Sequence, residues 1–321
     1  MRLLVTGGLG FIGSNFIRYW FKKHPKEVII NLDKVTYAAD QHNLVSIEKY
    51  DYNFVKGDIA DYETVFKISK NVDAIINFAA ESHVDNSIRD SSNFVRSNII
   101  GVHNLLEAVR KYEVRFHQVS TDEVYGSLPL NSKLKFNENS KYNPRNPYSA
   151  TKAAADHLVN AYFNTYNLPV TISNCSNNYG PNQHPEKLIP KAIINAEMQI
   201  SIPIYGNGFQ VRDWVYVEDH CSAIERILKK GKYGETYLIS ADSERCNIDV
   251  VKSILKELGK SENLINFVND RPGHDVRYAI DARKIKNELN WKPKVKFEDG
   301  LKLTIKHYVK NLDYYKKKVV T

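Results

Sequence analysis

Short apolar runs rich in β-branched residues alternate with longer amphipathic stretches over the first half of the chain. The runs lie at residues 2–6, 28–33, 53–55, 74–79, 116–121 and 170–175. Nearly continuous apolar strands that are separated by helices form parallel sheets covered by helices on both faces. The pattern therefore predicts an α/β protein with a doubly wound parallel sheet.

The pattern changes after about Asn177, where proline, glycine and asparagine become frequent. Helices are still expected near residues 249–258 and 299–311. No internal repeat or low-complexity linker separates the two regions. We therefore expect a large domain over residues 1–176 and a smaller C-terminal α/β domain mainly over 177–321, with some late segments returning to the large domain.

The composition is that of a folded globular protein. Of the 321 residues, 42% are hydrophobic and 26% are charged, which excludes a disordered or fibrous chain. The formal net charge of +8 raises the question of nucleic-acid binding. The basic residues are spread along helical stretches, however, so no nucleic-acid partner is expected. Only Tyr314 to Lys318 form a run, and a solvated surface is its favoured interpretation.

Cysteine spacing and hydropathy bear on the compartment. Cys175, Cys221 and Cys246 are far apart and show no CxxC spacing, as expected of reduced thiols. The N-terminus runs directly into the first predicted strand, and no apolar stretch approaches the length of a membrane span. These features predict a soluble cytoplasmic protein without a membrane partner.

A glycine-rich loop, Gly7-Gly8-Leu9-Gly10-Phe11-Ile12-Gly13, follows the first predicted strand and leads into a helix. Gly7 allows a tight turn, Gly10 lets the backbone approach a pyrophosphate, and Gly13 lets the helix pack on the strand. Asp33, at the end of the second strand, would accept hydrogen bonds from ribose hydroxyls and repel a 2′-phosphate. The loop predicts a site for NAD rather than NADP. The alternative is a βα turn whose glycines serve geometry alone.

Tyr148 and Lys152 are four residues apart in a predicted helix, which places both side chains on one face. A nearby ammonium group would lower the pKa of the tyrosine and favour a phenolate that can take a hydroxyl proton. The pair occurs by chance in many helices, so its meaning comes from its combination with the glycine loop.

Two adjacent carboxylates, Asp122 and Glu123, follow Thr121 at the end of the fifth predicted strand. This is the edge at which open α/β sheets bind ligands. Oxidation at one carbon needs a hydroxyl and a tyrosine. A dehydration also needs a base for a carbon-bound proton and an acid for the departing hydroxyl, and neighbouring carboxylates in different environments can divide these tasks.

These motifs together resemble the extended short-chain dehydrogenase/reductase family and, within it, the nucleotide-sugar 4,6-dehydratases. The glycine spacing GxxGxxG and the YxxxK pair mark only the superfamily, whereas Thr121-Asp122-Glu123 and the RPGHD segment at 271–275 are far more specific. Further resembling segments, which extend the match over essentially residues 1–310, are 79–85 (AAESHVD), 173–181 (SNCSNNYGP), 186–190 (EKLIP) and 212–214 (RDW). The chain departs from the family at Asn86, where arginine is common, and at Thr151, where serine is frequent.

The resemblance implies the dehydration of dTDP-glucose to dTDP-4-keto-6-deoxyglucose. Tyr148 would remove the C4 hydroxyl proton while NAD takes the C4 hydride, and Thr121 would hydrogen-bond the same oxygen. Glu123 would then abstract the C5 proton, and Asp122 would protonate the leaving C6 hydroxyl. The hydride would return to C6, so NAD would stay tightly bound and be regenerated in each cycle.

The glycine loop and the resemblance imply two sets of binding residues, in a cofactor domain and a nucleotide-sugar domain. Residues expected to bind NAD are Gly7, Gly10, Phe11, Ile12, Gly13, Asp33, Lys34, Asp58, Ile59, Phe78, Ala79, Ala80, Ser82, Asn98, Ser120, Tyr148, Lys152 and Asn178. Residues expected to bind the substrate are Ser82, Thr121, Asp122, Glu123, Asn177, Lys187, Leu188, Pro203, Ile204, Tyr205, Arg212, Asn247, Arg271 and His274. Taken singly, Arg212 could instead form a local ion pair with Asp213, and Pro272-Gly273 could be only a turn.

Other functions on the same scaffold stay open. They are a UDP-glucose 4,6-dehydratase, a UDP-sugar 4-epimerase, a UDP-glucuronate decarboxylase and a binding protein without catalysis. The adjacent carboxylates argue against the epimerase and the decarboxylase. The presence together of Thr121, Asp122, Glu123, Tyr148 and Lys152 argues against a catalytically silent protein.

The histidines give no metal-binding spacing, so no metal is predicted. His83 is interpreted as a polar packing residue near the substrate, and His103, His117 and His157 as hydrogen-bonded structural residues. Relatives pair two long helices from each subunit, here near residues 90–112 and 148–166, so the resemblance also implies a homodimer.

Overall fold

The computed structural model describes residues 1–45 and 47–319. Its centre is a seven-stranded sheet with the order β10-β6-β5-β4-β1-β2-β3, in which every neighbouring pair is parallel. The strands are β1 (Arg2–Thr6), β2 (Val28–Asp33), β3 (Tyr52–Lys56), β4 (Ala74–Asn77), β5 (Arg115–Thr121), β6 (Val170–Cys175) and β10 (Thr236–Ile239). The predicted doubly wound parallel sheet is confirmed.

The strand bounds follow the apolar runs closely, with two differences. β4 ends at Asn77, two residues earlier than predicted, because from Phe78 the chain turns across the glycine loop, where Gly7 closely approaches Ala79. β10 was not predicted, since its four residues find their place only through pairing with β6, from Thr236 opposite Ile172 onward.

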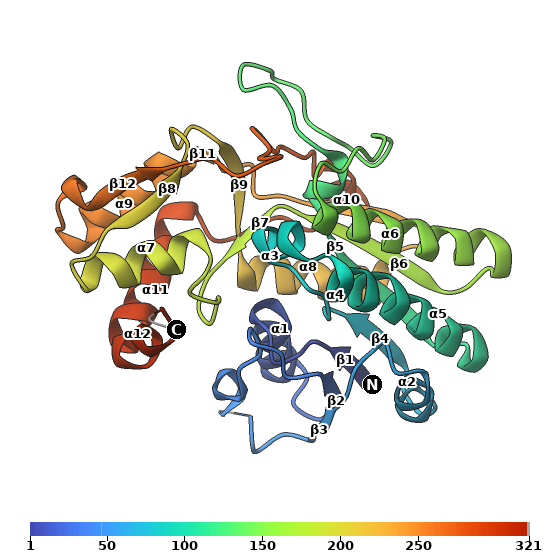
Figure 1. Cartoon of the computed structure of the whole chain (residues 1–321). Helices are drawn as coiled ribbons and strands as arrows, with labels where there is room; N and C mark the ends of the chain where they lie inside the picture. Colours follow the sequence, from blue (N-terminus) through green and yellow to red (C-terminus); the bar gives the residue numbers. More distant parts are fainter. Residues whose placement is uncertain (46, 320–321) are drawn as a thin grey trace.

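Helices cover both faces of this sheet (Figure 1). On one face α1 (Phe11–Lys23) and α8 (Val217–Lys230) enclose a core that includes Phe16, Trp20 and Ile224. The other face carries α2 (Tyr62–Ser69), α5 (Gly101–Tyr112) and α6 (Pro147–Tyr166). At the edge, α10 (Arg283–Leu289) packs on β10.

A second set of elements lies beside the carboxyl ends of β5 and β6. Its strands are β7 (Asn177–Tyr179), β9 (Val211–Tyr216) and β11 (Glu244–Cys246) in one sheet and β8 (Ile202–Tyr205) with β12 (Ile265–Val268) in another. Its helices are α7 (Leu188–Glu197), α9 (Asn247–Leu258), α11 (Phe297–Lys310) and α12 (Leu312–Val319). Both helices predicted here are found, as α9 and α11, and each begins two residues earlier than expected.

Short helical segments complete the chain. They are η1 (Gln41–Leu44), α3 (Val84–Arg89), α4 (Ser92–Val95), η2 (Arg96–Ile100), η3 (Asp122–Tyr125) and η4 (Glu262–Leu264). The long helix expected near residues 90–112 is thus three pieces, in which the π-helical turn η2 joins α4 to α5. Such turns are frequent at functional sites, and this one carries Asn98.

The interpretation of Tyr314 to Lys318 as solvated surface is wrong in part. Tyr315 is only 4% exposed and belongs to the core of the second region. Tyr314 and Lys318 both donate hydrogen bonds to Asp40, in the loop after β2. The run therefore attaches the C-terminal helix to the N-terminal half of the chain.

Among the described residues, we find no helix with both the length and the apolar character needed to span a membrane.

Candidate active site

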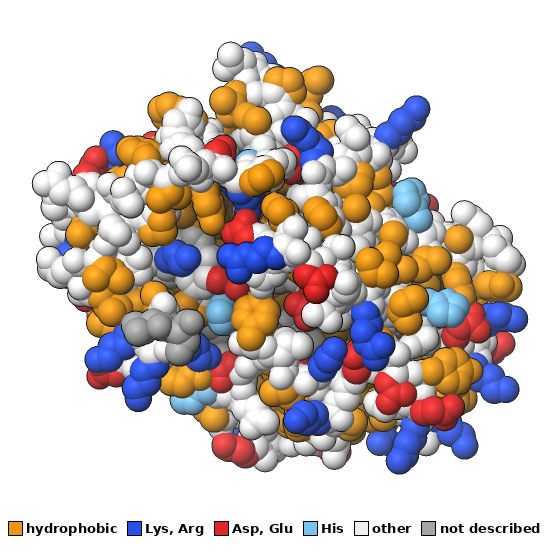
Figure 2. All heavy atoms as spheres, viewed as in Figure 1, with side chains coloured by type: hydrophobic (Ala, Val, Ile, Leu, Met, Phe, Trp, Pro, Cys, Tyr) orange, Lys and Arg blue, Asp and Glu red, His pale blue; other side chains and the backbone are white. Residues whose placement is uncertain are grey.

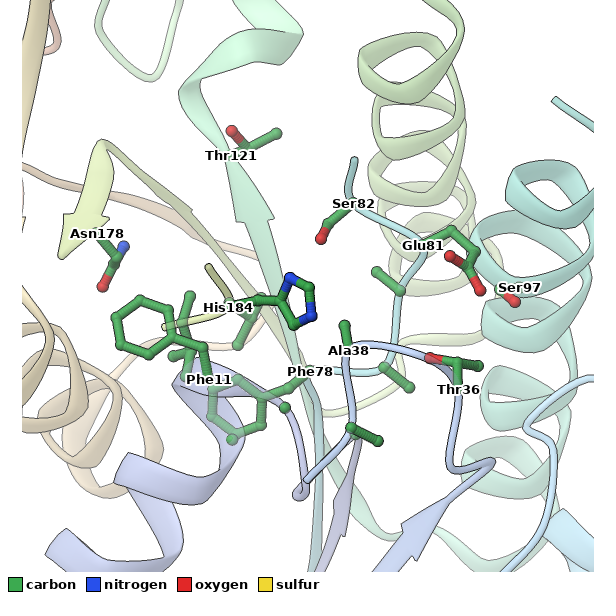
Figure 3. Close-up of a pocket in the computed structure, with 18 of the residues that line it drawn as sticks. Phe11, Thr36, Ala38, Phe78, Glu81, Ser82, Ser97, Thr121, Asn178 and His184 are labelled. Atoms are coloured by element: carbon green, nitrogen blue, oxygen red, sulfur yellow. The ribbon is translucent and has the colours of Figure 1, made fainter. Parts of the chain in front are cut away.

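A cavity of about 320 Å³ opens at the carboxyl ends of β1, β2, β4, β5 and β6 (Figure 3). The glycine loop and the predicted catalytic residues line it together. Of the residues expected to bind NAD, all except Asn98 line this cavity, and so do the expected substrate residues Ser82, Thr121, Asp122, Glu123, Asn177 and Lys187. Its size suits a ligand site, and its place is the one that open α/β sheets use.

The glycine loop has the close approaches that its spacing predicts. Gly7 has φ +67°, and a Cβ atom there would lie 2.6 Å from the backbone nitrogen of Ala79. A Cβ atom at Gly13 would lie 2.3 Å from the carbonyl oxygen of Gly7, because α1 begins against the turn. At Gly10 the nearest atom would be 3.3 Å away, so its backbone stays open to the cavity. This cradle fits a pyrophosphate at the N-terminus of α1.

Asp33 organises the rim at which the ribose is expected. Its carboxylate accepts hydrogen bonds from the backbone N–H groups of Leu9 (2.9 Å) and Val35 (2.8 Å). Burial raises the pKa of Asp33 despite these bonds. Val35 has φ +60°, a strained conformation for a β-branched residue, and such strain is concentrated at ligand sites.

Asn98 acts beneath the cavity wall and not in it. Its side-chain amide donates to the carbonyl of Glu81 (3.1 Å) and to the hydroxyl of Thr151 (3.0 Å), and its oxygen accepts from the N–H of Glu81 (2.9 Å). Asn98 therefore supports Glu81, which lines the cavity, and its expected contact with NAD stays a prediction. Thr151 supplies the hydroxyl that a serine would, so this departure from the family leaves the contact intact.

Tyr148 and Lys152 lie on one face of α6, as predicted, and both line the cavity. The protein groups alone do not give Tyr148 the lowered pKa that was expected beside Lys152. Burial of the phenol raises its pKa well above the usual value, and Glu123 adds to the effect. Lys152 is 4% exposed, and its ammonium group donates to the carbonyl of Val119 at 2.8 Å.

Asp156 is a buried carboxylate that was not predicted from the sequence as a site residue. It accepts hydrogen bonds from Ser120 (2.7 Å), Tyr142 (3.1 Å) and Asn174 (3.1 Å). Burial lowers the pKa of Lys152 and the charge of Asp156 opposes this effect, so Asp156 favours the ammonium form. The spacing from Lys152 to Asp156, again four residues, was the available signal.

Asp122 and Glu123 differ in their surroundings. Burial raises the pKa of Asp122 well above its usual value, and Glu123 and Asp213 add to this effect. Burial also raises the pKa of Glu123, but Arg271, Arg212 and Lys187 oppose it. Within the described residues, Oδ2 of Asp122 and Oε2 of Glu123 have no hydrogen-bond partner. The arrangement favours a protonated Asp122 beside a Glu123 that ionises more readily.

Several expected substrate residues meet at Asp85, on α3. The hydroxyl of Tyr205 donates to Asp85 at 3.1 Å, and a guanidinium nitrogen of Arg271 lies 3.6 Å from its other oxygen. His274 is close to Tyr205, with 6.2 Å between their ring centres. Lys187 reaches the carbonyl of Ser82 at 3.2 Å, which links α7 to the cavity wall.

Other expected substrate residues face elsewhere. Arg212 is 5% exposed and donates to the carbonyls of Val211 and Asp275, both at 2.8 Å, so its charge reaches the site while its hydrogen bonds serve the protein. Ile204 is buried in the core of the second region, and Leu188 packs against that core. Pro203 lies beside Ile204 in β8, and Asn247 begins α9. Neither residue lines the cavity.

The structure separates the two alternative interpretations, the Arg212–Asp213 ion pair and the turn at Pro272-Gly273. Asp213 accepts hydrogen bonds from Ser240 and Ser243, and no ion pair between Arg212 and Asp213 is found among the described residues. Gly273 has φ +66° and lies in a turn, as predicted if Pro272-Gly273 serves the backbone geometry.

The loop between β7 and α7 contributes cavity residues that were not predicted from the sequence. Gln183, His184 and Glu186 line the cavity, and Figure 3 shows His184 among the residues around it. Across the cavity mouth, Tyr37 donates to Glu186 (3.4 Å) and packs edge-on against His184. The only signal was the proximity of these residues to the resembling segments 173–181 and 186–190.

The histidines named from the sequence have polar or aromatic neighbours. His117 contacts the hydroxyls of Thr171 (3.0 Å) and Ser173 (3.1 Å), and His103 contacts Tyr162 (3.1 Å). His157 packs on Tyr142, and His83 lies 3.9 Å from both Asp85 and Glu186. Over residues 1–45 and 47–319, no group of three or more His, Cys, Asp or Glu side chains is placed to hold a metal ion.

Comparison with known proteins finds similar sequences over nearly the whole chain. The family model described as GDP-mannose 4,6 dehydratase matches residues 4–304. The chain is 47% identical to dTDP-glucose 4,6-dehydratase of Mycobacterium tuberculosis, over 98% of this chain and 96% of the relative.

Two solved structures are similar over almost the whole chain. One is a dTDP-glucose 4,6-dehydratase of Bacillus anthracis in complex with NAD, with TM-score 0.93, 47% identity and 99% of each chain covered. The other is a dTDP-glucose 4,6-dehydratase of Streptomyces venezuelae with NAD and TYD bound, with TM-score 0.95, 42% identity and coverage of 99% and 100%.

The glycine cradle generates a first prediction. Alanine at Gly13 would force α1 away from the turn, because the new Cβ would meet backbone atoms that cannot rotate aside. We expect Gly13→Ala to lower the free energy of unfolding by about 1–3 kcal/mol and to abolish NAD binding in a fluorescence titration. Gly259→Ala is the control, because it also strains the backbone (φ +64°) but has no atom within 4 Å. NAD binding to Gly13→Ala at the wild-type affinity would contradict the cradle.

Proposed function

The chain belongs to the nucleotide-sugar 4,6-dehydratase family matched by the GDP-mannose 4,6 dehydratase model, and from this membership we propose that it is an NAD-dependent dTDP-glucose 4,6-dehydratase. The reaction converts dTDP-glucose to dTDP-4-keto-6-deoxyglucose and water. The observation that carries this proposal is the pair Asp122 and Glu123, buried side by side in the cavity that also holds the glycine loop and Tyr148.

The cofactor fits the cradle at Gly7, Gly10 and Gly13, with Asp33 at the ribose end. NAD supplies a hydride acceptor and donor and places the positive charge of its oxidised ring in the site. Lys152 supplies a second positive charge at the cavity wall, and Asp156 favours its ammonium form against the effect of burial. These charges favour the phenolate of Tyr148, which the protein groups alone disfavour.

Each protein group then has one proton to move. Tyr148 accepts the C4 hydroxyl proton, and Thr121, at the end of β5, orients the same oxygen. The resulting ketone acidifies the C5 hydrogen, which Glu123 removes as a carboxylate. Asp122, whose pKa is raised by burial, gives its proton to the C6 hydroxyl as water leaves.

The nucleotide end of the substrate is assigned to the second region. Lys187 and Asn177 line the cavity, Arg271 and Tyr205 contact Asp85, and His274 lies beside Tyr205. Arg271 suits the pyrophosphate because its guanidinium group forms forked hydrogen bonds to phosphate oxygens. We accordingly propose residues 1–176 as the NAD domain with the catalytic groups, and 177–321 mainly as the nucleotide-sugar domain, with β10 returning to the large sheet.

The helices α3 to α6 support a homodimer. Ile88, Val95, Ile100 and Tyr166 are large apolar residues that are 39–46% exposed on these helices. Figure 2 shows hydrophobic side chains gathered on this side of the molecule. Exposed apolar patches of this kind mark association sites. A cytoplasmic location is part of the proposal, supported by three free cysteines among the described residues.

The proposal is tested first by substrate. The purified protein, without added cofactor, is incubated with dTDP-glucose and separately with UDP-glucose, and product mass is followed. We expect loss of one water from dTDP-glucose in preference to UDP-glucose. Loss from UDP-glucose alone would assign the same chemistry to a UDP-sugar, and no loss from either after NAD is supplied would contradict the proposed reaction.

Glu123→Gln separates the chemical steps. The amide cannot accept the C5 proton, so we expect water loss to fall by at least about 100-fold, while oxidation at C4 survives. After quenching, mass spectrometry should find a 4-keto sugar nucleotide that retains its C6 hydroxyl, in an amount equal to the enzyme. Asp122→Glu, which keeps an acid at position 122, is the control that retains measurable elimination. Full turnover by Glu123→Gln would contradict its role as the base.

Arg271→Gln changes the pH dependence. Arg271 opposes the effect of burial on Glu123, so its removal raises the pKa of that carboxyl group. Because Glu123 must be ionised to act, the acidic limb of kcat should move to higher pH, measured at saturating substrate. Arg245→Gln, which loses a cation paired with Glu298, should leave the limb in place. An unshifted limb in Arg271→Gln would show that the two groups are not coupled.

A further inference from the structure

The C-terminal helix α12 holds the loop that follows β2. Both Tyr314 and Lys318 donate to the same oxygen of Asp40, each at 2.5 Å. The ring of Tyr314 also stacks on His42, with 4.7 Å between ring centres. Asp40 is 14% exposed, so this contact is largely shielded from solvent. The partners are 274 and 278 residues apart in sequence.

The held loop forms part of the cavity wall. Thr36, Ala38 and Ala39, directly before Asp40, line the cavity. Figure 3 shows Thr36 and Ala38 in this wall. The backbone N–H of Asp40 donates to the carbonyl of Leu9 at 3.0 Å, and the amide of Asn43 reaches the same carbonyl at 3.1 Å. Asp40 is therefore attached to the glycine loop on one side and to α12 on the other.

The same end of the chain also supports the opposite wall. The hydroxyl of Tyr315 donates to Asn182 at 3.4 Å, and that of Tyr308, on α11, donates to the carbonyl of Gln183 at 2.5 Å. Gln183 and His184 line the cavity. The two walls meet where Tyr37 contacts His184 and Glu186, so helices α11 and α12 support both sides of the mouth.

We propose that Asp40, Tyr314 and Lys318 form a clasp that retains NAD in the cavity through the catalytic cycle. This rests on the proposed function, in which the same NAD molecule must serve both hydride transfers before the product leaves. Opening the loop 34–45 would expose the cofactor, because Thr36, Ala38 and Ala39 of that loop form part of the cavity wall. The three residues are positioning residues, since they hold the cavity wall and do not line the cavity.

The clasp can be opened from either side. Asp40→Asn keeps the oxygen that accepts from the N–H of His42 (3.0 Å) but replaces the acceptor of Tyr314 and Lys318 with an amide. Tyr314→Phe with Lys318→Met removes the two donors and leaves the loop sequence unchanged. Lys316→Met is the matched control, because Lys316 lies on the same helix and pairs with Asp313 within it.

The measurement is the rate at which each protein, loaded with radiolabelled NAD, releases the label into excess unlabelled NAD. We expect release at least about tenfold faster in Asp40→Asn and in the double variant, and a wild-type rate in Lys316→Met. Combining both sides should add little, because one contact is being removed twice. With saturating NAD supplied, kcat for dTDP-glucose should stay near the wild-type value in all variants.

The outcomes separate this proposal from the proposed function. Wild-type release rates in both opened variants would overturn the clasp, even if the dehydration proceeds. Effects of the two sides that add fully would also overturn it, since they would reflect general destabilisation. Failure of the wild-type protein to dehydrate dTDP-glucose would overturn the function, whatever the release rates are.

Discussion

The burial of two adjacent carboxyl groups at the end of β5 is the constraint on which the rest of the site depends. Removing a carboxylate from water favours its protonated form, and burial raises the pKa of both Asp122 and Glu123. Positive charge from Arg271, Arg212 and Lys187 reaches Glu123 and favours its ionised form. The second region of the chain therefore has an electrostatic task besides binding: it makes two chemically similar acids unequal, so that one can give a proton while the other takes one.

Buried charged groups also lie close together on α6. Its N-terminus presents Tyr148 to the cavity, its next turn buries Lys152, and the following turn buries Asp156, which balances that lysine. The protein groups alone raise the pKa of the tyrosine, and in the proposed mechanism the positive charge of bound oxidised nicotinamide would favour the phenolate. A site of this kind would need its cofactor in place, which is a physical reason for the NAD retention that we propose for the contacts of Asp40.

The sequence predicts those features of the fold and the site that depend on local patterns. The glycine loop, the strand ends that carry Asp33 and Asp122, and the helix spacing of Tyr148 all appear where expected. What the sequence could not provide depends on distant pairing. Ile204 faces a core because β8 pairs with β12, and β10 exists because β6 offers it an edge. The surroundings of Tyr148, and the contact of Asp40 with α12, likewise form only when remote segments meet.

In the proposed reaction, one bound NAD molecule carries hydride from C4 to C6 of the same sugar. A crossover experiment can follow this hydride. The enzyme is given an equal mixture of unlabelled dTDP-glucose and dTDP-glucose with deuterium at C4 and carbon-13 throughout the sugar, and the product is analysed by mass spectrometry. We expect deuterium at C6 and only in molecules that contain carbon-13. Deuterium in unlabelled product, or its loss to water, would rule out hydride transfer within one sugar.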